Sequence, residues 1–417
     1  MSNNRRAFLA TAVAGAASSV ASRSVSGDER PATTLPQLQQ AAARPVLQVP
    51  ELRSPVKVAS VELLRNGRTF LVRARSTDGA EGLAAANDDR LIDLYPILLR
   101  RVIPFFIGKD ARDLDRLVDV VYVHDSNYKL QGLALWVCVA SVEFALLDLL
   151  GKLTGKSIGN LLGGGVRKDI AVYRASGNRG NTPEEEIAYL QKLVAETGAK
   201  AIKFRLGGRM SKNNDSLPGR TETLIPLVRK TFGDAMTLYA DSNGSYDVPN
   251  SIRIGRMMES HGYAFLEEPC EFDQLWETKQ VADALDIPIA LGEQEFSVRR
   301  FQWIIENGAA QVIQPDLHYY GGFIRSIRVA RMAAAAGLPC TPHMSGAGLG
   351  YLDVLHFASC VPNVGPHQEF KGESTIPVSS DTSSLRCRDG IVRVPSGPGF
   401  GITIDPDFIR QTERVTI

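Results

Sequence analysis

The sequence has few cysteines, no excess of charge of either sign and no long apolar run. Its five cysteines are scattered and match no metal-binding spacing, so each is expected to be a small buried apolar residue: Cys138, Cys270, Cys340, Cys360 and Cys387. With 47 basic and 46 acidic residues the net charge is +1, which leaves no basic field for nucleic acid or an anionic membrane. No run of 18 apolar residues suggests a spanning helix. Any anionic substrate must therefore be held by local groups.

The N-terminus resembles an export signal. Arg5 and Arg6 precede a short, weakly apolar, alanine-rich run with small residues after it. This order predicts that residues 1–22 are a twin-arginine signal peptide and that the mature protein is periplasmic. The alternative is a flexible basic tail. No cysteine lies near the cleavage region, so no membrane anchor is expected there, and residues 23–52, rich in Ala, Ser, Gln, Arg and Pro, are predicted to be a linker.

Residues 53–165 carry strand patterns first and helix patterns afterwards. Two apolar runs, 56–64 and 69–75, flank Asn66-Gly67, which is a hairpin signal, and a third run covers 81–86. Helical patterns follow at 91–101, 111–121 and 133–150, and the last is apolar nearly all round, as a buried helix would be. We therefore expect an α+β domain here.

From residue 166 to about 388 the pattern becomes a steady alternation. Eight short apolar runs are separated by amphipathic stretches such as 184–197, 220–231, 251–261 and 325–336; the runs are 170–174, 201–205, 237–241, 264–267, 288–293, 311–316, 339–343 and 363–369. Eight such repeats predict an α/β fold of the TIM-barrel type. A doubly wound sheet is the alternative, but no glycine-rich phosphate loop follows any run.

One carboxylate or imidazole stands at the end of each of six consecutive runs. Asp241, Glu267 and Glu293 are separated by 267 − 241 = 26 and 293 − 267 = 26 residues, and Asp316, His343 and Glu369 follow at intervals of 23, 27 and 26. The carboxyl ends of barrel strands meet at one face, so these side chains should converge on one mouth. Single members could be surface acids, but six in register indicate a site.

Three neighbouring carboxylates need a cation, because like charges close together raise each other's pKa. Asp241, Glu267 and Glu293 offer hard oxygen ligands with no cysteine among them, which favours Mg²⁺. Asn243 shares a face with Asp241 and is predicted to contact substrate, unless it serves only the turn at Asn243-Gly244. Glu268 alternates with Glu267 and precedes Pro269, so we expect it to point away from the mouth.

Two cations and one imidazole complete the predicted site. Lys203 and Arg205 share one face of their strand and would meet a carboxylate substrate, although an outward, solvated pair is the alternative. Asp316 beside His343 would fix the imidazole tautomer and make it a general base. His318 and His367 stay unassigned. The long loop 207–219 is predicted to be a lid or specificity element.

These motifs resemble the enolase superfamily, and within it the mandelate racemase subgroup. The resemblance rests on Lys203-x-Arg205, Asp241-Ser242-Asn243, Leu266-Glu267-Glu268-Pro269, Gly292-Glu293, Gln314-Pro315-Asp316 and His343, and it covers about residues 55–405. It implies a (β/α)7β barrel under an α+β capping domain, with residues 389–417 returning to that domain. It also implies Mg²⁺ on the three carboxylates, an enediolate intermediate that Glu369 hydrogen-bonds as a neutral acid, and a homo-oligomer.

Arg205 stands where the subgroup often has a second lysine. A racemase needs two bases, and arginine stays protonated in proteins, so His343 with Asp316 is the one convincing base. We therefore expect a dehydratase of an aldonic or aldaric acid that yields a 2-keto-3-deoxy product, with Lys203 and Arg205 holding the substrate. The alternatives are a racemase or epimerase that uses Lys203 or Lys212 as second base, and an exported binding protein on an inactive barrel.

Overall fold

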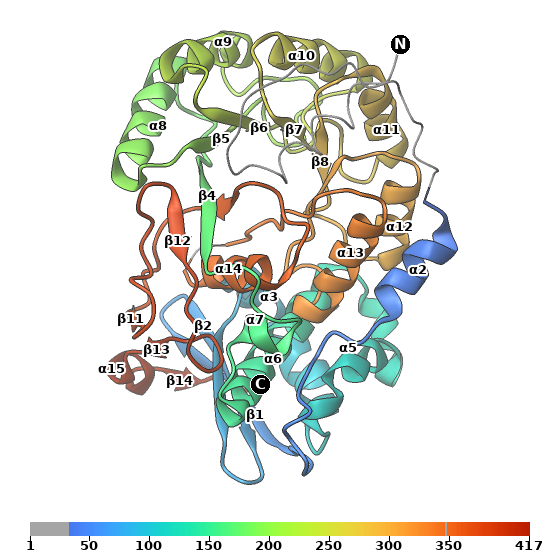
Figure 1. Cartoon of the computed structure of the whole chain (residues 1–417), viewed down its shortest axis with the longest axis vertical. Coiled ribbons are helices and arrows are strands. Elements are labelled where there is room, and N and C mark those ends of the chain that lie inside the picture. Colours follow the sequence, from blue (N-terminus) through green and yellow to red (C-terminus); the bar gives the residue numbers. More distant parts are fainter. Residues whose placement is uncertain (1–32, 347) are drawn as a thin grey trace.

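The computed structural model describes residues 33–346 and 348–417. An α+β capping domain lies at one end of the molecule, and the barrel helices α8 to α11 lie at the other (Figure 1). The segment predicted to be a twin-arginine signal, 1–22, lies outside the described residues.

The capping domain contains the predicted antiparallel sheet. β1 (Val58–Asn66) and β2 (Thr69–Ser76) form the hairpin across Gly67, whose φ of +59° is the left-handed backbone that glycine adopts most readily, and β3 (Glu81–Ala85) pairs with β2. β14 (Glu413–Arg414) adds to the other edge of β1. The C-terminal segment thus returns to the capping domain, as the resemblance implied.

Helices of the capping domain surround one long apolar helix, α6. The others are α3 (Asp88–Ile97), η1 (Leu98–Val102), α4 (Ile103–Phe106), η2 (Ala111–Asp113), α5 (Leu114–Val123), η3 (His124–Leu130) and α7 (Ile158–Leu161). α6 (Leu133–Thr154) is long and apolar enough to cross a membrane, but 89% of its most apolar stretch is buried inside the protein. It is the core helix that its all-round apolar pattern predicted.

Seven parallel strands curl into the barrel sheet. Their order is β10-β4-β5-β6-β7-β8-β9, with bounds β4 (Asp169–Ala175), β5 (Ala201–Arg205), β6 (Thr237–Asp241), β7 (Phe265–Glu267), β8 (Ile289–Leu291), β9 (Val312–Ile313) and β10 (Gln368–Phe370). The predicted strand at 339–343 is reduced to single bridges from Cys340 to Ile313 and from His343 to Asp316. Pro339 and Pro342 lack the N–H groups that a continuous ladder needs.

The barrel helices alternate with these strands. They are α8 (Pro183–Thr197), α9 (Arg220–Phe232), α10 (Val248–Ser260), α11 (Leu275–Ala284), α12 (Val298–Glu306), α13 (Phe323–Ala335) and α14 (Gly350–Cys360). Short C-terminal elements follow: β11 (Val378–Ser379), β12 (Ile391–Arg393), β13 (Thr403–Ile404) and α15 (Pro406–Arg410). β12 pairs antiparallel with β4. All five cysteines are buried and free, in agreement with their predicted role.

The prediction of a linker over residues 23–52 is wrong within the part that the structure describes, residues 33–52. α2 (Leu35–Ala43) packs against α13, and its Leu38 is fully buried. The chain after α2 is fixed by Asp115, whose carboxylate accepts the N–H groups of Val46 and Leu47 at 3.0 and 2.8 Å. The helix has nine residues and one fully buried side chain, so the alanine-rich sequence holds too few apolar positions for a helical period to be recognised.

Two buried acids of α6 join the capping domain to the rest of the chain. Glu143 accepts the N–H groups of Phe323 and Ile324, at 2.6 and 3.1 Å, and so caps the N-terminus of α13. Asp148 accepts the N–H groups of Leu83 and Phe400, at 2.9 and 3.0 Å. Both carboxylates satisfy backbone donors that burial would otherwise leave unpaired.

We predict that Glu143→Gln lowers the free energy of unfolding by about 1–3 kcal/mol, because the amide nitrogen faces a backbone donor that has no other acceptor. Equilibrium urea unfolding measures the change. The matched control is Glu306→Gln on the exposed end of α12, which should change the stability by less than about 0.5 kcal/mol. Equal stabilities of the two variants would refute the capping role of Glu143.

Candidate active site

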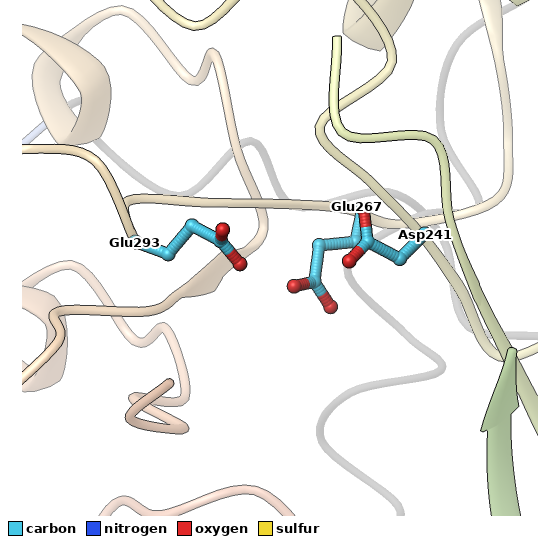
Figure 2. Close-up of side chains that lie close together, drawn as sticks. All are labelled: Asp241, Glu267 and Glu293. Atoms are coloured by element: carbon cyan, nitrogen blue, oxygen red, sulfur yellow. The ribbon is translucent and has the colours of Figure 1, made fainter. Parts of the chain in front are cut away.

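Three carboxylates lie together at the carboxyl ends of neighbouring strands. Asp241 ends β6, Glu267 ends β7, and Glu293 follows β8 by two residues. The register of β6 on β7 pairs Asp241 with Glu267. One oxygen of each acid lies within 4.8 Å of the other two, and all three side chains are buried. Figure 2 shows Glu293 directed across the mouth towards the other pair.

The donor set of this triad fits a hard divalent cation. Burial raises the pKa of Glu267, and the charges of Glu293 and Glu369 raise it further against the opposing effect of Lys203. Oε2 of Glu293 is buried and accepts no hydrogen bond among the described residues. Buried carboxylate oxygens with free lone pairs, and no sulfur ligand among them, are the donors that Mg²⁺ binds.

Lys203 and Arg205 project from β5 into the same mouth. Nζ of Lys203 lies 2.9 and 2.8 Å from the two carboxylate oxygens of Glu267 and 3.2 Å from Oε1 of Glu369. Arg205 forms an ion pair with Asp241. Burial lowers the pKa of Lys203, but Glu267 and Glu369 raise it above its usual range. Lys203 is therefore held as a cation in this arrangement, and the outward, solvated alternative for the pair is wrong.

His343 and Asp316 form the predicted pair. Nδ1 of His343 lies 2.7 Å from Oδ2 of Asp316, and Oδ1 of Asp316 accepts two backbone N–H groups from the turn that follows it, both at 2.8 Å. These bonds fix the carboxylate and hence the imidazole ring. Nε2 of His343 is left facing the triad, 3.3 Å from Oε2 of Glu293. A carboxylate on one ring nitrogen leaves the other free to accept a proton.

Glu369 lies in the mouth, but its surroundings oppose the neutral acid that the resemblance implied. Burial would raise its pKa, whereas the charges of Lys203, Lys371 and His343 together lower it well below its usual range. Oε2 of Glu369 also accepts the N–H of Met344 at 2.9 Å. These surroundings favour the ionised carboxylate over the neutral acid, since hydrogen bonds and cations favour the charged form.

The prediction that Glu268 points away from the mouth is wrong. Its φ is +44°, so the backbone before Pro269 is left-handed and strand alternation ends at Glu267. Oε2 of Glu268 accepts Nδ2 of Asn243 at 2.9 Å, and the same nitrogen lies 3.5 Å from Oε1 of Glu293. Burial first, and then the charge of Glu293, raise the pKa of Glu268. Glu268 is thus a further carboxylate beside the triad.

Asn243 is surrounded by arginines that the sequence pattern did not identify. Arg179 follows β4 and Arg209 lies in the long loop after β5, and both donate to Oδ1 of Asn243. Loop residues have no strand or helix period, so no regular signal marks them.

The unassigned histidines also have partners: His318 lies 3.2 Å from Asp353 on α14, and Nδ1 of His367 lies 3.0 Å from the hydroxyl of Tyr239.

Two family models match the chain. The model for the mandelate racemase / muconate lactonizing enzyme N-terminal domain matches residues 41–163, and the model described as enolase C-terminal domain-like matches residues 185–408. These ranges correspond to the capping domain and the barrel. Together they include the site residues described above except Arg179, which lies between the two ranges.

Known proteins agree with these matches. Arabinonate dehydratase of Saccharolobus solfataricus is 26% identical over 79% of this chain and 86% of its own. A suspected racemase from Roseobacter denitrificans has a TM-score of 0.80 and 35% identity over 86% of this chain and 99% of its own. A mandelate racemase/muconate lactonizing protein from Paracoccus denitrificans, solved with magnesium, has a TM-score of 0.77 and 26% identity over 87% and 99%. The chain belongs to the mandelate racemase/muconate lactonizing enzyme group of the enolase superfamily.

Proposed function

We propose that the protein is a Mg²⁺-dependent dehydratase of sugar acids. The observation that carries the proposal is the presence of one imidazole base, His343, facing two cations that suit substrate holding rather than proton abstraction: Lys203 is ion-paired with Glu267 and Glu369, and Arg205 stays protonated in proteins. One base suits elimination, which removes one proton and returns one. The arabinonate dehydratase relative supports the same class of reaction.

The site would hold the substrate through its carboxylate. Asp241, Glu267 and Glu293 would bind Mg²⁺, as the magnesium-bound relative supports. When bound, the ion supplies the positive charge that makes the proton beside the substrate carboxylate acidic enough for a side-chain base. Lys203 and Arg205 would hold and polarise the carboxylate or a substrate hydroxyl, because both are buried cations on the lumen face of β5.

His343 would move the proton at both steps. With Nδ1 bonded to Asp316, Nε2 accepts the proton from the carbon next to the carboxylate. The electron pair of that C–H bond then forms the new C=C bond as the C–O bond to the β-hydroxyl breaks. Nε2 returns its proton to the departing hydroxide, which leaves as water, and the enol product becomes the 2-keto-3-deoxy acid.

We expect the purified chain to form 2-keto acid from at least one sugar acid in the presence of Mg²⁺, and to lose this activity when EDTA removes the metal. Semicarbazide derivatives of the product, followed by absorbance, measure the reaction. Restored activity after Mg²⁺ is added back controls for damage by the chelator. If no aldonic or aldaric acid in a panel gives keto acid, the dehydratase proposal is refuted.

We predict that His343→Asn lowers kcat by about 10²–10⁴-fold, because the variant keeps the shape of the ring edge but has no base. Substrate binding, measured by the shift in thermal unfolding with Mg²⁺ present, should stay close to that of the native chain. His124→Asn in the capping domain is the matched control. Turnover that survives His343→Asn would favour a binding protein or another base.

A racemase or epimerase is the second candidate, and the similarity to the suspected Roseobacter racemase favours it. Both reactions exchange the substrate α-proton in D₂O. In the proposed single-base site the deuterium enters with retention and keto acid accumulates. Mixed stereochemistry at that carbon without keto acid would establish the second candidate and would show that a lysine, Lys203 or Lys212, acts as second base despite the ion pairs of Lys203.

We also propose export to the periplasm, which rests on Arg5-Arg6 and the alanine-rich run after it. Replacing both arginines by lysine should move the protein from the periplasmic to the cytoplasmic fraction, measured by immunoblot after osmotic shock. Arg23→Lys, beyond the predicted signal, should leave the distribution unchanged. A periplasmic double variant would contradict the twin-arginine route.

A further inference from the structure

Three guanidinium groups converge on one neutral oxygen beside the metal-binding triad. Oδ1 of Asn243 lies 2.6 Å from Nη2 of Arg179, 3.2 Å from Nη1 of Arg205 and 3.2 Å from Nη2 of Arg209. The three arginines come from three separate segments: the β4–α8 loop, the end of β5 and the loop 207–219. We call them the arginine cluster.

Two members of the arginine cluster form no ion pair among the described residues. Arg205 pairs with Asp241, but Arg179 and Arg209 have no carboxylate within 4.0 Å among the described residues. Nε of Arg179 and Nε of Arg205 are buried and likewise lack an acceptor there. Burial, and then the charges of Arg205 and Arg209, lower the pKa of Arg179 to about 9. Like charges gathered around an amide oxygen, with Arg205 buried, Arg179 half-buried and Arg209 exposed, form a site for an anion.

Backbone contacts hold the two loop arginines in place. Buried Arg220 donates to the carbonyls of Asn181 and Arg205, at 2.7 and 2.8 Å, which ties the β4–α8 loop to the end of β5. The N–H of Met210 donates to the carbonyl of Asn243 at 3.0 Å, which fixes the residue after Arg209. Positioning that is independent of the amide oxygen indicates a preformed site.

The arginine cluster lies one side chain away from the proposed metal site. The amide of Asn243 presents its oxygen to the arginines and its nitrogen to Glu268 and Glu293. A sugar acid whose carboxylate is at the triad can therefore place its other end at the arginine cluster. Arginine presents paired donors in a planar fork that matches a carboxylate.

We infer that the arginine cluster binds a second carboxylate at the far end of the substrate, so that the substrate is an aldaric diacid rather than an aldonic acid. This inference rests on the proposed function for the position of the first carboxylate. A sugar acid with a terminal phosphate offers similar anionic chemistry, and an uncharged terminal hydroxymethyl group offers none.

Isothermal titration of the Mg²⁺-loaded His343→Asn chain, which should not turn over substrate, tests the inference. Two stereochemically matched pairs serve as probes: galactarate with galactonate, and glucarate with gluconate, and 6-phosphogluconate is added to the second pair. We expect the diacid of at least one pair to bind about 10- to 100-fold tighter than its monoacid, the contribution expected of a charge-assisted hydrogen-bonded contact. Equal affinities in both pairs, no binding of any probe, or tightest binding of the phosphate would overturn the inference.

Variants identify the residues responsible. Arg179→Gln and, separately, the exposed Arg209→Gln should each reduce the preference for the diacid by about 10-fold or more while monoacid affinity changes little. Lys230→Gln, an exposed cation of α9, removes the same charge elsewhere and should keep the preference. An unchanged preference in both arginine variants would refute the assignment.

The outcomes separate the inference from the proposed function. Keto acid formed from aldonic acids, without a diacid preference in binding, leaves the function standing and refutes the inference. A diacid preference that depends on Arg179, with no keto acid formed, leaves the arginine cluster standing and refutes the dehydratase.

Discussion

The crowding of buried carboxylates at one mouth is the constraint on which the site depends. Five acids gather at the ends of β6, β7, β8 and β10: Asp241, Glu267, Glu268, Glu293 and Glu369. Burial raises the pKa of Glu267 and Glu268, because a carboxylate loses its hydration there. Lys203 lies between Glu267 and Glu369, and Arg205 pairs with Asp241. A divalent cation is the remaining charge that this arrangement needs.

The same constraint separates the roles of the basic groups. The two carboxylates beside Lys203 raise its pKa, which favours the protonated amine. A protonated lysine suits the binding of an anion and is a poor base. His343 is placed differently. Asp316 binds its Nδ1 on the side away from the mouth, which leaves Nε2 facing the mouth. The proposed roles in proton transfer and substrate holding therefore follow from the position of each group relative to the acids.

The sequence predicted the strand-end residues well because regular geometry places them. Spacing of 26 residues identified Asp241, Glu267 and Glu293, since each βα unit returns the chain to the same face. The prediction failed where the backbone departs from that geometry. Glu268 has a positive φ, which strand alternation cannot represent. The strand at 339–343 is interrupted by two prolines, and α2 is stabilised by contacts with α13 rather than by a strong helical pattern.

Two members of the arginine cluster, Arg179 and Arg209, were not identified as site residues from the sequence for a different reason. Arg179 and Arg209 lie in loops, and only the fold brings them to Asn243, which is itself at φ +41°. Strand ends carry the carboxylates and the base because the chemistry needs fixed distances within a rigid sheet. Groups that distinguish substrates can lie in loops, because loop changes leave the sheet intact. In this chain the loops bring Arg179 and Arg209 to Asn243 without an ion-pair partner among the described residues, and a second anionic group on the substrate is the ligand that we propose for them.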